Sequence, residues 1–172
     1  SMCTGLPSWM IQFFHACLKY SHSPKLTEVL PNLKLLITAG VNYRPYLQQF
    51  NDLFDHKITV REMYGASEGF FAYQESSEQD SMLLDVGNGI YYEFLELNNP
   101  SCRVNLAQVK INTPYILILN TCAGLWGYKI GDIIEFQSIM PYRLKVVGRT
   151  NHFISIQTEH VYTQHVEAAI EK

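Results

Sequence analysis

The stretch ITVREMYGASEG, residues 58–69, most clearly indicates the fold of this protein. Its first half, 58–63, is rich in β-branched and apolar residues, which is typical of a strand. Its second half sets small residues between two glycines, which is typical of a tight turn. Upstream, the apolar residues follow helical, strand and helical spacing in turn over residues 9–18, 33–38 and 43–54. The first 65 residues therefore alternate helix, strand, helix and strand, which predicts a parallel α/β arrangement.

From residue 66 onward the pattern changes to short runs rich in Tyr, Val, Ile and Phe, separated by Gly, Asn or Pro. Strands at this spacing predict an antiparallel sheet or a small barrel. A last segment, about 159–171, has helical spacing again. The predicted fold class is mixed α/β, with a parallel part over 1–65 and a mainly β part over 66–150. The strands expected in the second part cover residues 70–74, 82–86, 90–97, 104–111, 115–120, 133–136 and 142–147.

The composition excludes several classes of protein. The chain has 172 residues, 47% of them hydrophobic and 17% charged, so it can bury a core and is not a disordered segment. A net charge of -3 gives no basic surface for nucleic acid, and no apolar run is long enough to span a membrane. The four cysteines lie far apart in the sequence and no secretory signal is visible, so we expect reduced thiols and a cytoplasmic location.

The first candidate site follows directly after the strand predicted at 58–63. Loops beyond the carboxyl ends of parallel strands are where α/β sheets bind ligands. A carboxylate there, Glu68, can hold a divalent cation that bridges phosphates, and Tyr64 can stack on a base. The alternative interpretation is a glycine turn with a solvated glutamate.

Two further candidate sites each contain one charged residue. Asp132 ends the segment GLWGYKIGD, residues 124–132, and its carboxylate can accept hydrogen bonds from both hydroxyls of a ribose. Arg149 follows the strand predicted at 142–147 and can contact a phosphate or a ribose. Each also has a plain structural interpretation, a hairpin turn for Asp132 and an exposed arginine for Arg149. The sequence contains neither of the glycine-rich phosphate loops GxxxxGK and GxGxxG.

Taken together and in this order, these motifs resemble the GH3-type acyl-acid-amido synthetases of plants and their bacterial relatives. That family belongs to the acyl-adenylate-forming, firefly-luciferase-like superfamily, and the resemblance covers nearly the whole chain. The residues that carry it are 5–10 (GLPSWM), 36–41 (LITAGV), 64–71 (YGASEGFF), 89–94 (GIYYEF), 121–132 (TCAGLWGYKIGD) and 147–149 (VGR).

The resemblance implies an activity and a set of site residues. Such enzymes use ATP and Mg²⁺ to turn a small carboxylic acid into an acyl-adenylate, and then pass the acyl group to an amine such as an amino acid. Glu68 would be the catalytic residue that coordinates Mg²⁺, Asp132 would bind the ribose hydroxyls and Arg149 would lie near the ribose. Tyr64 would lie against the adenine. The other residues expected to line the nucleotide are Ala39, Gly40, Val41, Gly65, Ala66 and Ser67, and those expected to reach the acid are Phe70 and Thr121.

The resemblance also predicts parts that this sequence lacks. The phosphate loop of the family would precede residue 1, and the C-terminal lid would follow Lys172, so that 1–150 is part of a large domain and 151–172 the hinge and the start of the lid. Thr158-Glu159 stands where bacterial relatives have Gly-Glu, and His160 lies near the place of a lysine in the plant enzymes. We therefore expect a fragment that is inactive alone. An acyl-CoA-forming ligase and a non-catalytic nucleotide-binding or interaction fragment remain as alternatives.

Overall fold

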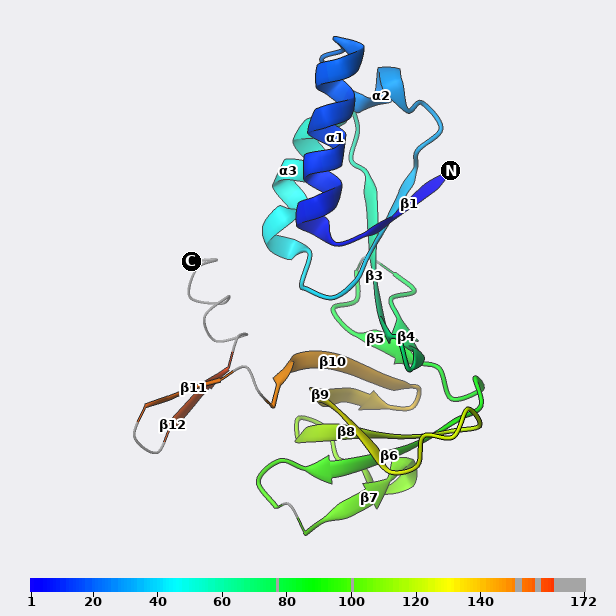
Figure 1. Cartoon of the computed structure of the whole chain (residues 1–172), viewed down its shortest axis with the longest axis vertical. Helices are drawn as coiled ribbons and strands as arrows, with labels where there is room; N and C mark the ends of the chain where they lie inside the picture. Colours follow the sequence, from blue (N-terminus) through cyan, green and yellow to red (C-terminus); the bar gives the residue numbers. More distant parts are fainter. Residues whose placement is uncertain (77, 100, 151–152, 157–158, 163–172) are drawn as a thin grey trace. The chain divides into compact units, whose positions relative to one another are not determined.

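A computed structural model of the chain describes residues 1–76, 78–99, 101–150, 153–156 and 159–162 (Figure 1). The chain forms two compact units, Ser1–Met82 and Leu83–Lys172, and each is considered by itself. No helix in the described part of the chain is long and apolar enough to cross a membrane.

The first unit has the parallel α/β arrangement that the sequence predicts. Its first three strands pair in parallel, and Leu36 lies opposite Cys3 on one side and Val60 on the other. The strand at the start of the chain is not predicted from the sequence, because four residues are too few to show an alternation of apolar and polar side chains. The elements of this unit are β1 (Met2–Gly5), α1 (Pro7–Ser21), α2 (Leu26–Val29), β2 (Leu35–Thr38), η1 (Arg44–Tyr46), α3 (Leu47–Leu53), β3 (Thr59–Ala66) and β4 (Gly69–Tyr73).

The core of the first unit lies between its helices and one face of the parallel strands. Leu36 of β2 and Val60 of β3 belong to this core and are 0% and 3% exposed. Phe14 of α1 is fully buried and meets Phe50 and Phe54 edge-on, with ring centroids 6.5 and 6.1 Å away. These buried rings join α1 to α3 and the segment that follows it.

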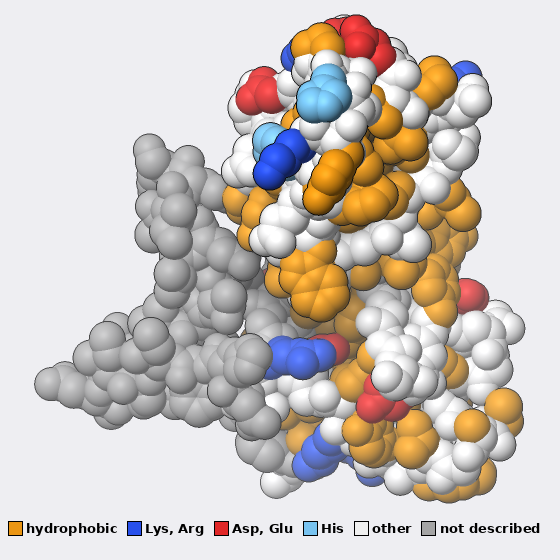
Figure 2. All heavy atoms as spheres, turned by 45° about the horizontal axis from the view of Figure 1, so that its top comes forward, with side chains coloured by type: hydrophobic (Ala, Val, Ile, Leu, Met, Phe, Trp, Pro, Cys, Tyr) orange, Lys and Arg blue, Asp and Glu red, His pale blue; other side chains and the backbone are white. Residues whose placement is uncertain are grey.

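The outer face of α1 carries large aromatic side chains to the surface. Trp9, Phe13 and Tyr20 are 69%, 56% and 83% exposed. Figure 2 shows hydrophobic side chains between charged ones over the helical part of this unit. Phe13 and Phe14 are neighbours in the sequence, yet only Phe14 belongs to the core.

The strand β3 extends further than predicted and ends at Ala66. The tight turn expected at 64–69 is therefore wrong for Tyr64, Gly65 and Ala66, which lie in this strand. β3 pairs with the antiparallel β4, and the pairing is irregular between Tyr64 and Gly65. The turn itself is a two-residue hairpin loop of Ser67 and Glu68. At Gly65 the backbones come close, since a Cβ atom there would lie 3.3 Å from the Gly69 carbonyl oxygen.

The second unit contains the predicted antiparallel sheet, in which five strands lie in the order β10-β9-β8-β6-β7. The fold class of the chain is therefore mixed α/β, as predicted. β5 (Met82–Leu84) lies at the boundary between the units. The remaining elements are β6 (Ile90–Glu96), β7 (Arg103–Asn105), η2 (Leu106–Gln108), β8 (Pro114–Thr121), β9 (Tyr128–Ile139) and β10 (Tyr142–Arg149).

Two strands of this sheet differ in length from the prediction. Of the strand expected at 104–111 only 104–105 are formed, as part of β7, because Asn105 begins a 3₁₀ turn with a capping box that includes Gln108. The strand expected at 133–136 runs instead from Tyr128 to Ile139, since its early residues pair with β8 and with β10. The glycines at 127 and 131 interrupt the apolar pattern, so the first part of β9 is not predicted from the sequence.

Aromatic rings join the strands of the second unit. The ring of Phe94 lies 5.2 Å from that of Phe136 and 6.0 Å from that of Tyr115, in edge-on contacts. Phe94 and Phe136 are fully buried and Tyr115 is 1% exposed. Since the three residues come from β6, β8 and β9, one cluster connects three of the strands.

The segment after β10 contains a strand where a helix is predicted. β11 (Phe153–Ile156) and β12 (Glu159–Tyr162) form an antiparallel pair. The helix expected at 159–171 is therefore wrong for 159–162, because these residues pair with a neighbouring strand. Residues 163–171 lie outside the described part of the chain.

We expect the neighbouring residues Phe13 and Phe14 to respond very differently to substitution. Phe14→Ala removes a buried ring and should lower the free energy of unfolding by about 3–5 kcal/mol. Phe13→Ala removes a ring that is 56% exposed and should change it by less than about 1 kcal/mol. Urea denaturation of both variants measures the difference, and equal losses would contradict this description of the core.

Candidate functional site

The parallel pairing of β2 with β3 brings two predicted site segments to one edge of the sheet. Thr38, at the end of β2, lies opposite Glu62 of β3. The side chain of Thr38 is fully buried, and its hydroxyl donates a hydrogen bond to the Arg61 carbonyl oxygen at 3.2 Å. Residues 39–41 come directly after Thr38 and residues 64–66 come shortly after Glu62, so both segments lie at the same end of the paired strands. This is the carboxyl edge, where α/β sheets bind ligands.

The turn after β2 is shaped by Gly40. This residue has φ +83°, a left-handed conformation that favours glycine, and a Cβ atom there would lie only 2.9 Å from Leu6 Cδ2. Ala39 is half-buried, and Val41 is 43% exposed. The tight approach of Leu6 fixes the path of the backbone through 39–41, and the Val41 side chain remains accessible.

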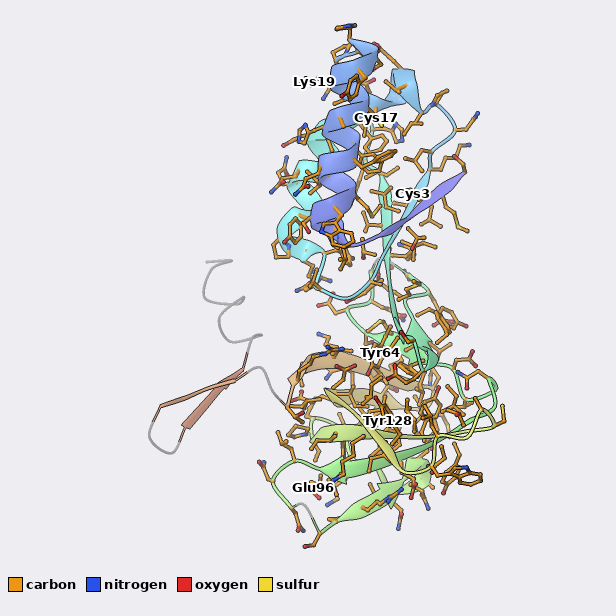
Figure 3. All side chains as sticks on the ribbon, in the orientation of Figure 1. Cys3, Cys17, Lys19, Tyr64, Glu96 and Tyr128 are labelled. Atoms are coloured by element: carbon orange, nitrogen blue, oxygen red, sulfur yellow. The ribbon has the colours of Figure 1, made fainter. Side chains whose placement is uncertain are left out.

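The aromatic residues of β3 and β4 point in different directions. Tyr64, labelled in Figure 3, is 7% exposed and its ring meets that of Phe71 edge-on at 4.9 Å. Phe70 is 40% exposed and its ring stacks with that of Tyr73 at 6.1 Å. Tyr64 is therefore held rigidly by its neighbours in the first unit, and Phe70 presents an accessible apolar surface.

Glu68 lies in the hairpin loop between β3 and β4 and is partly exposed, and Ser67 beside it is exposed. Among the described residues, no three His, Cys, Asp or Glu side chains gather into a metal site. A single carboxylate suits Mg²⁺ only when other ligands come from substrate phosphates and water, which is the usual manner of Mg²⁺ binding at nucleotide sites. Glu68 therefore fits a magnesium ion that arrives with a nucleotide.

In the second unit, Asp132 and Arg149 form an ion pair across neighbouring strands. They lie opposite each other on β9 and β10, and Arg149 Nε donates to Asp132 Oδ1 at 2.5 Å. The Asp132 side chain is 3% exposed, and that of Arg149 is 55% exposed. A buried carboxylate requires such a partner, because an uncompensated charge is costly away from water. Both residues are candidates from the sequence, but their contact with each other is not predicted.

The backbone beside this ion pair has a fixed shape. Gly131 has φ +88°, and its carbonyl oxygen accepts a hydrogen bond from the Thr150 amide at 2.8 Å. A Cβ atom at this position would lie 3.4 Å from Thr150 Oγ1. The glycine of the predicted Gly-Asp motif thus lets the end of β10 approach β9 next to Asp132.

Thr121 lies at the end of β8 and starts the loop that leads to β9. Its amide donates to the Leu125 carbonyl oxygen at 2.8 Å, and its hydroxyl accepts from the Leu125 amide at 3.4 Å. Thr121 is 8% exposed, and Trp126 in the same loop is 81% exposed. The expected acid-contacting residue is therefore engaged in holding its own loop.

A group of polar residues beside this loop is not predicted from the sequence. Asn120 Oδ1 accepts from the Gly127 amide at 2.8 Å, and Asn120 Nδ2 donates to Glu93 Oε2 at 2.7 Å. Arg103 in turn forms a salt bridge with Glu93. These contacts hold the pKa of the Glu93 carboxyl below its usual range, chiefly through the hydrogen bond from Arg103. The signal in the sequence is faint, a polar Asn at the end of the apolar run YILIL.

The predicted site residues thus fall into two groups. Ala39–Val41 and Tyr64–Glu68 gather in the first unit, and Phe70 lies close by in β4. Thr121, Asp132 and Arg149 belong to the second unit, in which Asp132 and Arg149 are in contact.

Comparisons with known proteins point to one family. Residues 83–149 match the GH3 family central domain. The chain is 30% identical over 162 residues to the indole-3-acetic acid-amido synthetase GH3.3 of Arabidopsis thaliana, with 85% of this chain and 26% of the relative covered. It is 26% identical over 172 residues to the jasmonoyl-L-amino acid synthetase JAR4 of Nicotiana attenuata, with 92% and 30% covered.

The fold has the same relatives. The solved structure of the GH3.15 acyl acid amido synthetase superposes with a TM-score of 0.67 at 22% identity, covering 85% of this chain and 27% of the other. At this identity the match establishes a shared fold. The chain spans only 26% and 30% of the length of the two curated relatives named above.

We expect the Asp132–Arg149 pair to contribute to stability. Arg149→Met removes the donor to a buried carboxylate and should lower the free energy of unfolding by about 1–3 kcal/mol. Asp132→Asn in the same protein should recover part of this loss, because the uncompensated charge is gone. A double-mutant cycle by urea denaturation measures the coupling, with the exposed Lys129→Met as the control on the same strand. Additive effects of the two changes would show that the pair contributes nothing.

We also expect a specific pH dependence from Glu93. Its pKa is lower in the folded chain than the ordinary value of 4.5, so its stabilising effect is complete above that pH and is lost as the pH falls through the folded-state pKa. Glu93→Gln cannot titrate. The difference in unfolding free energy between wild type and this variant should therefore shrink between pH 7 and pH 3. A difference that stays constant over this range in urea denaturation would refute the prediction.

Proposed function

Because residues 83–149 match the GH3 family central domain, we propose that the chain is part of an ATP-dependent acyl-acid-amido synthetase, in which its first unit contributes adenine- and metal-binding residues and its second unit contributes ribose-binding residues. The observation that carries the proposal is the grouping of 39–41 with 64–66 at the carboxyl edge of the parallel strands. The Asp132–Arg149 pair supports it, since a carboxylate in a fixed orientation is what recognition of a ribose diol requires.

The proposed reaction has two steps. A carboxylate oxygen of the acid attacks the α-phosphorus of ATP, and the bond to pyrophosphate breaks, which leaves an acyl-adenylate. The nitrogen of an amine then attacks the acyl carbon, the bond to AMP breaks, and the amine loses a proton. Both steps depend on holding the reactants in line and on offsetting negative charge at phosphorus.

Glu68 has the metal-binding role in this proposal. Mg²⁺, when bound, supplies positive charge against the phosphate oxygens during displacement of pyrophosphate. The partly exposed loop of Ser67 and Glu68 can present its carboxylate to an ion that already has phosphate ligands. The two-residue hairpin loop limits the motion of this carboxylate, because both ends of the loop are paired strands.

The other residues have binding roles. Tyr64 and 65–67 lie against the base from one side and Ala39, Gly40 and Val41 from the other. Asp132 accepts hydrogen bonds from the ribose hydroxyls, while Arg149 holds its Oδ1 atom and lies next to the ribose. Phe70 offers an apolar surface for the acid, and Thr121 lies where the loop before β9 begins.

An amine acceptor is favoured over a thiol. The relative that matches 85% of the chain is named an indole-3-acetic acid-amido synthetase, and the one that matches 92% is named a jasmonoyl-L-amino acid synthetase. We extend to this protein only the class of reaction, a small carboxylic acid joined to an amine. A cytoplasmic location suits this proposal, because ATP is available there and the four cysteines of the chain remain reduced.

A binding experiment tests the proposal. Isothermal titration of the chain with AMP should show binding, and Asp132→Asn should weaken it about tenfold, the effect of losing charged hydrogen bonds to the ribose. Glu68→Gln should leave AMP binding nearly unchanged but abolish the gain in ATP affinity that Mg²⁺ provides. Asp55→Asn, an exposed acidic residue outside the site, is the matched control.

Three outcomes would count against this assignment. Absence of AMP binding at millimolar concentration would favour an interaction fragment without a nucleotide site. Equal effects of Asp55→Asn and Asp132→Asn would remove the role of Asp132. A full Mg²⁺ dependence in Glu68→Gln would remove the role of Glu68.

A further inference from the structure

Asn120 makes hydrogen bonds that connect two strands and a loop. It lies near the end of β8, and its Oδ1 atom accepts from the amide of Gly127, which ends the 121–127 loop. Its Nδ2 atom donates to Glu93 Oε2 of β6 at 2.7 Å and approaches the Tyr91 carbonyl oxygen at 3.3 Å. All of the polar atoms of this side chain are therefore used within the second unit.

The Glu93–Arg103 pair decides which way the Asn120 amide faces. An ionised carboxylate only accepts hydrogen bonds, so the NH₂ group of Asn120 must face Glu93. The carbonyl oxygen of the same amide is then turned toward Gly127, the donor. Arg103 of β7 stabilises the ionised form of Glu93. A rotated Asn120 amide would place its NH₂ group against the Gly127 amide and lose both bonds.

The Asn120–Gly127 contact lies where the pairing of β8 with β9 ends. Leu119 and Tyr128 are opposite residues in this pairing, and Asn120 and Gly127 are their immediate neighbours on the loop side. Tyr128, labelled in Figure 3, is the first residue of β9, and Asp132 lies further along the same strand. Gly127 has φ +62°, a left-handed conformation that glycine adopts without the strain other residues would have. The hydrogen bond to Asn120 closes the loop at this point.

We propose that Asn120 is a positioning residue: its amide, oriented by Glu93 and Arg103, holds the 121–127 loop and the start of β9, and so sets Asp132 for the ribose. This inference rests on the proposed nucleotide-binding function. Asn120 touches neither substrate nor nucleotide in this account, and it acts through Gly127. The exposed Trp126 lies in the anchored loop and reports on its motion.

The test uses a change of charge at constant shape. Asn120→Asp keeps the size of the side chain and the acceptor for Gly127, but it sets one carboxylate against another at Glu93. Adding Glu93→Gln removes the opposing carboxylate and with it the repulsion. A purely space-filling role of Asn120 predicts no effect of Asn120→Asp, whereas an oriented amide predicts a loss that Glu93→Gln repairs. Asn98→Asp, an exposed turn residue of the same unit, is the matched control.

Two readouts do not depend on ligand. Amide hydrogen exchange at Gly127 should become at least tenfold faster in Asn120→Asp and in Asn120→Ala, and the added Glu93→Gln should return the Asp variant to within about threefold of wild type. Fluorescence anisotropy of Trp126, measured in a Trp9→Phe protein, should fall in the same two variants and recover in the double variant. Exchange within twofold of wild type in Asn120→Asp, or no recovery in the double variant, would overturn the proposal.

A third readout links the loop to the site. The AMP affinity should weaken about threefold to tenfold in Asn120→Asp and recover with Glu93→Gln, as for the loss of one hydrogen bond. A mobile loop with unchanged AMP affinity would overturn the link to Asp132. If the wild-type chain binds no AMP, the proposed function fails, and exchange and anisotropy alone then decide whether Asn120 anchors the loop.

Discussion

The parallel register of β2 and β3 is the constraint on which the first unit depends. It sets Leu36 beside Val60 under the helices, and at the far end it sets Thr38 beside Glu62. The buried hydroxyl of Thr38 donates a hydrogen bond to the backbone of β3 and so favours this register. A shift of the pairing by one residue would also turn every side chain of the strand to the opposite face of the sheet. The placement of 39–41 and 64–66 at the same edge of the sheet follows from that register.

The second unit is organised differently. Its strands are antiparallel, and Asp132 and Arg149 come from positions that face each other across β9 and β10. The burial of Asp132 and the exposure of Arg149 give the pair an inner and an outer member. Polar side chains near the β8–β9 connection, Asn120 and Glu93, extend this arrangement into the loop. Polar contacts therefore add to the aromatic packing of the second unit, whereas strand register and apolar packing organise the first.

Much of this could be predicted from the sequence. The mixed α/β class follows from periodicity, and the resemblance to the GH3 family, stated from motifs alone, is confirmed by the family match over 83–149. The partner of Asp132 could not be predicted, because it depends on which residues of β9 and β10 face each other. Tyr64 was expected in a turn, but pairing with β4 outweighs the turn preference of its glycine neighbours. The helix expected from 159 onward fails at 159–162 for the same reason, since pairing with β11 outweighs local spacing.

The contact between Leu6 and Gly40 has a consequence for how this fold can vary. A side chain at position 40 would collide with Leu6, which stands at the entry to α1. The entry to the first helix and the turn after β2 thus meet in a packing contact, beside the hydrogen bond that the Ala39 amide donates to the Gly5 carbonyl oxygen. A larger residue at 40 would have to adopt a left-handed backbone conformation and displace the end of the Leu6 side chain, so we expect glycine to be favoured there during evolution. A packing contact and a backbone conformation together limit which residues this turn can accept at the carboxyl edge of the parallel strands.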